Sequence, residues 1–174
     1  MSTNIGALRG QAGVDLSWSD TQMEICQQGV RMPYRSGMLT LSPRVNLRAA
    51  GWLNVEYTFN YRYTQLRIES AAPTDRHAFD QRLQLNFTPA RNLVLQLTGE
   101  HYRTQLSDTQ SKNLVLLDAS ARWKVGQRWE LWATATNLLN ETEYAYTLFD
   151  ELSSSTSRYA IRPCNLLLGA SWRF

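Results

Sequence analysis

The sequence predicts an all-β protein in which about eight antiparallel strands run up and down in one sheet. Two observations along its 174 residues support this fold class. Apolar and polar residues alternate with period 2 over most of the chain, whereas the 3.6-residue period of helices is hard to find. The strands are also separated alternately by short turns and by longer polar segments, so each strand is expected to pair with the next.

The first three expected strands show the alternation with increasing clarity. A weak pattern covers residues 7–18, and a clear one covers residues 39–49, where the odd positions are apolar and the even ones polar. The Ala50-Gly51 turn then leads into residues 53–63, a strand that is unusually long for a soluble sheet. All three strands therefore have one apolar and one polar face.

Five further strands are expected in the second half of the chain. They cover residues 83–87, 93–100, 115–123, 129–138 and 165–174, and the fourth of them has the weakest pattern. Tight turns lie near residues 50–51, 89–91 and 125–127, whereas the connections 19–35, 70–78, 106–113 and 139–158 are longer and polar. Short turns are thus expected at one end of the sheet and long loops at the other, as in bacterial outer-membrane barrels.

Charge distinguishes the two faces of these strands. The apolar face carries no charged residue in the expected strands, and a bilayer requires such a face, because one Lys or Arg near the midplane costs ~2–4 kcal/mol. The charged residues expected on the opposite face, lining a wet lumen, are Arg44, Arg48, Glu56, Arg62, Arg82, Glu100, Asp118, Arg122 and Arg173. Their role stays open among cross-strand pairing, contact with another segment and a substrate path.

Aromatic residues are expected to form two girdles at the margins of the apolar face. Those beside the short turns are Trp52, Trp123, Trp129, Trp172 and Phe174, and those near the long loops are Trp18, Tyr61 and Tyr63. This arrangement favours strands that cross a membrane. A soluble barrel or sandwich that turns the apolar face inward remains the alternative.

The composition excludes several other classes of protein. The 6 Trp, 8 Tyr and 5 Phe residues exclude intrinsic disorder, because so much aromatic surface is not left in water. The net charge of +3 comes from scattered arginines without a basic run, so nucleic acid is not expected as a partner. No window approaches the ~20 uninterrupted apolar residues of a transmembrane helix. Residues 1–6 lack the pattern of a signal peptide.

No arrangement of residues predicts catalysis or a bound metal. Cys26 and Cys164 lie far apart, and His77 and His101 have no partners at ligand spacing, so neither a metal nor another cofactor is expected. The serines at 153–155 have no neighbouring base, so an enzyme is not expected. Weak candidates for contact with an extracellular ligand in the segment 139–158 are Tyr144, Tyr146, Phe149 and Asp150, with ordinary loop packing as the alternative.

Three segments in the last third of the chain carry a resemblance to a known family. Residues 117–123, 129–140 and 161–174 resemble the C-terminal part of TonB-dependent outer-membrane receptors, especially the Bacteroidota type. The most specific piece is the Asn-Leu-Leu-Asn step from Asn137 to Asn140, followed by Glu143-Tyr144. The resemblance implies that residues 1–174 are the C-terminal part of a barrel of about 22 strands in the bacterial outer membrane. It also implies energy-coupled uptake of a scarce nutrient, such as an iron complex, a vitamin, a glycan or a peptide.

The resemblance has further implications and some departures. The barrel assembly machinery is implied to recognise the last strand, which gives Trp172 and Phe174 a role in membrane insertion. A signal peptide, a plug domain and an energy-coupling motif are not visible, so the coupling protein TonB is expected to act only through a missing N-terminal part. The alternative is a small autonomous outer-membrane barrel of eight strands with a structural or adhesive role. Pairing of residues 7–18 with residues 165–174 would indicate that alternative, and we expect the open form instead.

Overall fold

The computed structural model describes residues 2–5, 9–27, 29–68, 72–105, 111–149 and 154–173. In these residues the chain forms strands and no helix, which confirms the predicted all-β class. Accordingly, none of the described residues forms a helix that could cross a membrane.

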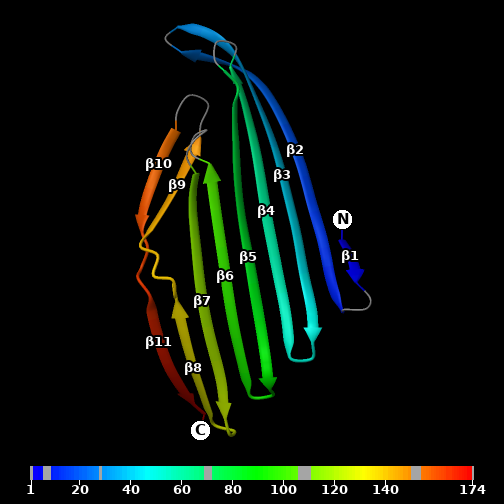
Figure 1. Ribbon diagram of the computed structural model, residues 1–174, viewed down its shortest axis with the longest axis vertical. Coiled ribbons are helices and arrows are strands. Elements are labelled where there is room, and N and C mark those ends of the chain that lie inside the picture. The colour runs from blue at the N-terminus through cyan, green and yellow to red at the C-terminus, as the bar shows by residue number, and fades with distance from the viewer. Residues whose placement is uncertain are drawn as a thin grey trace.

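The main sheet contains nine strands in the order β1-β2-β3-β4-β5-β6-β7-β8-β11, and each strand is antiparallel to its neighbours (Figure 1). The bounds are Ser2–Ile5 for β1, Gly10–Gln27 for β2, Val30–Ala50 for β3, Leu53–Ile68 for β4, Thr74–Ala90 for β5, Leu93–Gln105 for β6, Ser111–Val125 for β7, Trp129–Thr136 for β8 and Asn165–Trp172 for β11. A separate hairpin joins β9 (Glu143–Phe149) to β10 (Ser154–Ala160). Apart from the short β1, eight strands thus run up and down as predicted.

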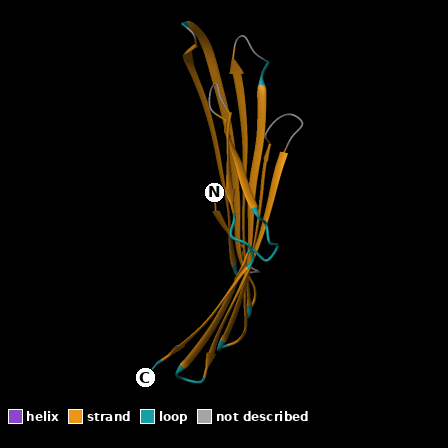
Figure 2. Ribbon diagram, turned by 90° about the vertical axis from the view of Figure 1, so that its left-hand side faces the viewer, coloured by secondary structure: helices purple, strands orange, loops and turns teal. Residues whose placement is uncertain are grey.

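The sheet is open. Strands β1 and β11 lie at opposite edges, and no ladder joins them or joins β2 to β11 within the described ranges. In Figure 1 the β1–β2 edge and the β8–β11 edge stand on opposite sides of the molecule. Seen from the side, the main sheet is one twisted layer (Figure 2). The expectation of an open form is therefore confirmed.

Because no second layer covers either face of the sheet in the part of the chain that the structure describes, these residues form no ordinary hydrophobic core. Among the described apolar residues, only Tyr34 and Leu114 are buried, with 5% and 7% of their surface exposed. By contrast, Leu16 is 67% exposed and Leu168 is 71% exposed. Side chains of this kind are rarely left in water in such number on one face.

The structure corrects the prediction of long loops in three places. Residues 19–35 were expected to form a loop, but β2 and β3 continue through them to a tight turn at Gly29, where φ is +81°. Most of residues 139–158 belong to the β9–β10 hairpin, and β5 already begins at Thr74. The hydropathy of these segments does not continue the apolar face of the neighbouring strand segments, but backbone hydrogen bonds pair their strands all the same. Period-2 hydrophobicity therefore underestimates the length of the strands at this end.

Candidate membrane interface and polar face

The strand registers align the apolar positions of neighbouring strands into continuous rows. One such row crosses seven strands through Leu47, Val55, Leu85, Leu97, Ala119, Ala135 and Leu166. The side of the sheet that carries this row is called the apolar face, and the other side is called the polar face. Because side chains alternate in a strand, a row on one face fixes the orientation of every other residue in the ladder.

The apolar face has an uncharged band of nearly constant height. It covers residues 39–49 of β3, 53–63 of β4 and 115–125 of β7, together with the residues of the other strands that stand opposite them, and the residues on this face include no Asp, Glu, Lys or Arg. We call this region the apolar band. Its height agrees with the ~9–11 residues that a tilted strand needs to cross a bilayer.

Aromatic side chains mark both margins of the apolar band. At the short-turn end, the rings of Trp129 and Trp172 lie 6.2 Å apart between centroids, and those of Trp52 and Phe87 meet edge to face at 5.1 Å. The indoles at this margin are about half exposed. At the other margin, which we call the upper margin, Trp18 is also exposed. Of the two residues implied in assembly, Trp172 therefore belongs to the margin at the short-turn end, whereas Phe174 lies outside the described residues.

Tyr61 and Tyr63 share the upper margin with His77. The hydroxyl of Tyr61 lies 2.7 Å from Nδ1 of His77, and the ring of Tyr63 lies 5.1 Å from the imidazole between centroids. Tyr63 also donates a hydrogen bond to Asp75. A ring with an apolar body and a polar tip suits the boundary between hydrocarbon and water.

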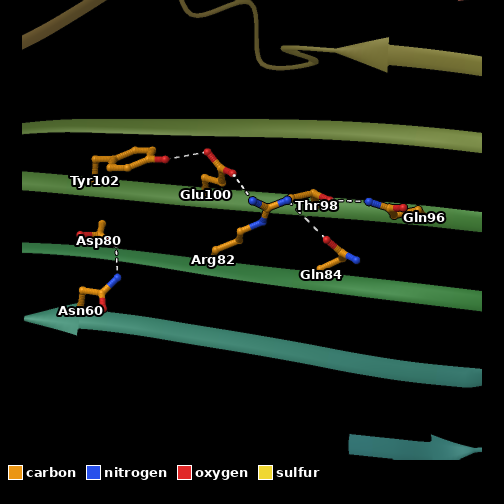
Figure 3. A network of polar contacts seen from close by, with 8 residues as sticks. All are labelled: Asn60, Asp80, Arg82, Gln84, Gln96, Thr98, Glu100 and Tyr102. Atoms are coloured by element: carbon orange, nitrogen blue, oxygen red, sulfur yellow. Dashed lines mark hydrogen bonds and ion pairs between the residues drawn. The ribbon is translucent and has the colours of Figure 1, made fainter. Parts of the chain in front are cut away.

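Four of the predicted lumen residues form three ion pairs across strands on the polar face. Arg44 pairs with Asp15 at 3.1 Å, Arg82 with Glu100 at 3.5 Å and Arg122 with Glu130 at 3.3 Å. Figure 3 shows the central part of this face, where Tyr102 donates to Glu100 at 2.7 Å and Arg82 lies 3.4 Å from Gln84. Cross-strand pairing is thus part of their role.

The other predicted lumen residues have different surroundings. Glu56 accepts a hydrogen bond from Asn54 at 3.1 Å, and Asp118 accepts one from the backbone N–H of Asn137 at 2.8 Å. Arg48, Arg62 and Arg173 are exposed, and none of them forms an ion pair with another described residue.

Trp132 is a feature of the polar face that the sequence pattern did not reveal. It lies directly opposite Gly169 in the β8–β11 ladder, and a Cβ atom at position 169 would overlap its indole. The ring of Trp132 therefore covers the glycine of the edge strand, a known way to compensate for a missing side chain. Glycine at position 169 leaves room for the indole, whereas a residue with a Cβ atom would not.

Beyond the upper margin, the two faces of β2, β3 and β4 exchange their polarity. On the side that continues the apolar face, Nε of Arg35 donates to both carboxylate oxygens of Asp20 at 3.0 and 3.1 Å. On the opposite side, Met23, Tyr34 and Ile68 form one row of apolar residues. We call this part, residues 19–27, 30–38 and 64–68, the loop-end region.

Two carboxylates at this end of the molecule have altered acidity. The hydrogen bond from Arg35 lowers the pKa of Asp20 below its ordinary value. The hydrogen bond from Lys112, 2.8 Å long, likewise lowers the pKa of Glu143 at the start of β9. Both carboxylates remain charged near neutral pH and hold strands of this end together.

The Asn-Leu-Leu-Asn step forms a junction around the buried side chain of Asn137. Asn137 and Asn140 have φ values of +53° and +56°, a conformation that asparagine tolerates better than most residues. The side-chain amide of Asn137 donates to the carbonyls of Glu141 and Arg162 at 2.7 and 2.8 Å, and its oxygen accepts from the N–H of Glu141 at 2.9 Å. Since Asp118 accepts the backbone N–H of Asn137, this one residue links β7 to the connections on both sides of the β9–β10 hairpin.

Three of the four predicted ligand contacts lie in a strand instead of a loop. Strand β9 contains Tyr144, Tyr146 and Phe149, and Asp150 lies outside the described residues. In the part of the chain that the structure describes, no three His, Cys, Asp or Glu side chains gather as a metal site would require. Cys26 and Cys164 are exposed free thiols.

Comparison of the chain with protein-family models, with curated proteins and with solved structures gives no match.

Proposed function

We propose that this sheet is the C-terminal part of a TonB-dependent receptor barrel in the bacterial outer membrane, which takes up a scarce nutrient with energy coupling. The observation that carries the proposal is the apolar band: an uncharged, bilayer-high surface on a single-layer sheet with no core behind it. The resemblance around Asn137 supports the choice of family among outer-membrane barrels.

A bilayer accounts for the apolar band better than water does. Burying one Val, Leu, Ile or Phe side chain stabilises a protein by ~1.5–3 kcal/mol, and here many such side chains have no covering layer. Lipid tails cover such a face directly. The polar face then meets a wet lumen, where its ion pairs and amides remain solvated.

The open edges favour a large barrel over the autonomous eight-stranded one. Among the described residues, β11 pairs only with β8, and β1 covers only residues 10–13 of β2. Unpaired backbone groups are not tolerated in hydrocarbon, so further strands are needed at both edges. In the proposed receptor, neighbouring barrel strands supply them.

The proposed receptor also gives a role to the predicted residues that have not yet been assigned one. Arg48, Arg62 and Arg173 lack ion-pair partners among the described residues, so they are the lumen side chains best suited to contact a substrate or another segment of the receptor. The β9–β10 hairpin with Tyr144 and Tyr146 stands at the extracellular end. Contact with TonB occurs through an N-terminal part that these residues do not include.

Refolding tests the membrane location. The urea-dissolved chain is diluted into buffer, into detergent micelles and into lipid vesicles, and its secondary structure and protease resistance are measured. We expect a β-rich, protease-resistant product only with detergent or lipid, in which the open edges of several copies pair with one another. A monodisperse β-rich monomer in plain buffer would contradict the proposal.

The receptor assignment needs a separate test. The DNA upstream of the codon for Met1 is sequenced in the source genome, and a continuous reading frame that encodes a plug domain is expected. A stop codon directly upstream, together with a closed barrel in lipid, would instead indicate the autonomous structural barrel.

A further inference from the structure

Near its upper margin, the apolar face carries a patch of polar side chains on β4, β5 and β6. The hydroxyl of Tyr57 donates to Oε1 of Gln81 at 2.9 Å, and Nε2 of Gln81 lies 3.0 Å from Nδ1 of His101. Gln81 stands directly opposite His101 in the β5–β6 ladder, and both lie on the side of the apolar row. Polar side chains are costly on a surface that faces lipid, and those that occur there usually have a function.

The amide of Gln81 determines which nitrogen of His101 carries the proton. A carboxamide nitrogen can only donate, so Nδ1 of His101 is the acceptor and the ring proton lies on Nε2. No described residue accepts a hydrogen bond from this Nε2–H. The ring of Phe79 meets the imidazole edge to face, with 5.3 Å between centroids. His101 therefore has an unused N–H donor in the patch.

Arg103 supplies the positive charge of the patch. It stands directly opposite Phe79 in the β5–β6 ladder and two residues from His101 along β6, so its side chain starts from the same side of the sheet. Arg103 is exposed and forms no ion pair with another described residue. The exposed His77 lies diagonally across the ladder, next to Tyr61.

Hydrogen-bond donors exceed the available acceptors in this patch. Among the described residues on this side of β4 to β7, the only carboxylate is that of Asp75. It already accepts hydrogen bonds from Tyr63 and Gln65, both at 3.1 Å. The guanidinium of Arg103 and the Nε2–H of His101 are therefore complementary to an oxyanion and not to a cation.

The depth of the patch indicates which oxyanion is present. Tyr61 and Tyr63 mark the level of the lipid headgroups on the adjacent strand β4. Directly below Arg103 the surface is apolar, since Leu83 and Val115 on the two sides of β6 are each 41% exposed. A free anion would leave these two side chains uncovered. A lipid covers them with its acyl chains and brings its phosphate to the level of the arginine.

We infer that this patch binds the phosphate group of one anionic lipid in the leaflet at the upper margin. Arg103 and the Nε2–H of His101 donate to the phosphate oxygens, and the acyl chains lie against Leu83 and Val115. The inference rests on the proposed membrane location, and it adds a lipid class and a binding site to it.

Lipid retention tests the inference. The full chain is refolded into vesicles with equal amounts of phosphatidylglycerol and phosphatidylcholine that have the same acyl chains. It is then extracted in mild detergent, and native mass spectrometry identifies the retained lipid. We expect one lipid per chain, with about a fivefold preference for phosphatidylglycerol, the factor that corresponds to one cation near an anionic lipid.

Three variants separate the roles of charge and hydrogen bonding. Arg103→Gln should remove the preference for phosphatidylglycerol. His101→Phe keeps an aromatic ring but has no N–H donor, and it should lower the retention of both lipids by about fivefold, the factor for one hydrogen bond. Arg67→Gln removes the same charge from the same side of the sheet, four residues beyond Tyr63 along β4, and should leave retention and preference unchanged.

The outcomes distinguish the lipid site from the membrane location. If the chain inserts into pure phosphatidylcholine vesicles but retains both lipids equally, or if Arg103→Gln keeps the preference, the lipid site is wrong and the membrane location stands. If the chain inserts into neither kind of vesicle, both are wrong. Excess inorganic phosphate should leave the lipid bound, and displacement of the lipid would show that the patch binds a free anion instead.

Discussion

The apolar band and the loop-end region belong to the same strands and have the same alternation, but opposite chemistry. In the band, the residues on the apolar face of β3 and β4 are uncharged, and the other face carries ion pairs such as Arg44 with Asp15. In the loop-end region, the same side of the sheet carries Asp20 with Arg35, and the other side carries the apolar residues around Tyr34.

This inversion shows what sets the pattern in each region. If one protein core covered the apolar face, the face would keep its character along the whole strand. Instead it ends at an aromatic margin, near Trp18 and Tyr63, as it would where hydrocarbon gives way to water. Beyond that level, the side of the sheet that continues the apolar face carries charged residues. The opposite side carries a small apolar cluster, in which Tyr34 is only 5% exposed.

The largest expected effect comes from a charge in the middle of the apolar band. Leu97→Arg should destabilise the protein in lipid vesicles by ~2–4 kcal/mol, because arginine is then exposed to hydrocarbon. Gln96→Arg, one residue away on the polar face, should change stability by less than ~1 kcal/mol, since only a weak contact with Thr98 is lost. Urea unfolding of the vesicle-bound protein measures both, and equal costs would contradict the assignment of the faces.

The second-largest loss of stability is expected at the junction around Asn137. Asn137→Ala removes three side-chain hydrogen bonds at a residue that is 6% exposed, and the expected cost is ~2–3 kcal/mol. Asn140→Ala, which removes only the bond to the N–H of Cys164, should cost about 1 kcal/mol. Unfolding in the same vesicles gives both values. A cost for Asn137→Ala no larger than for Asn140→Ala would show that the junction is not rigid.

A third pair of substitutions compares the two regions along one strand. Leu16 and Gln22 lie on the same side of β2, but only Leu16 is in the apolar band. Leu16→Glu should therefore cost ~1–2 kcal/mol in vesicles, somewhat less than an arginine at mid-depth. Gln22→Glu should stay within ~0.5 kcal/mol, as surface substitutions usually do. Similar losses at both positions would mean that the boundary near Trp18 is misplaced.

Local alternation was enough to predict much of this fold. Which residues share a face follows from period 2 alone, so the strands around Leu47, Val55 and Leu97 and their apolar face were predicted correctly. The order of the strands followed from the short turns. The extensions of β2 and β3 were missed because their apolar residues lie on the other side of the sheet. The strands there are held by backbone hydrogen bonds, which leave no mark in a hydropathy pattern.

Features that depend on register could not be predicted from the sequence. Asp15 and Glu130 were not recognised as partners of Arg44 and Arg122, because a pair across strands is decided by which residues stand opposite. The cover of Gly169 by Trp132 has the same origin. The pairing of Ala119 with Ala135 and of Ala121 with Ala133 on β7 and β8 likewise depends on the register.

The smallest expected effect is a pH response confined to the loop-end region. Because Arg35 lowers the pKa of Asp20 in the folded protein, the ion pair stabilises this region fully above the ordinary value of 3.8 and loses that effect as the pH falls through the lowered pKa. Amide hydrogen exchange in residues 19–38 should thus be constant from neutral pH to about 5, after correction for intrinsic rates, and should accelerate only near and below the ordinary pKa of an aspartate, about 4. Asp20→Asn should accelerate it already at neutral pH, while exchange in the apolar band around Val55 stays unchanged in both tests. Acid-induced exchange that rises equally in the band and in the loop-end region would show that the two regions do not respond to separate surroundings.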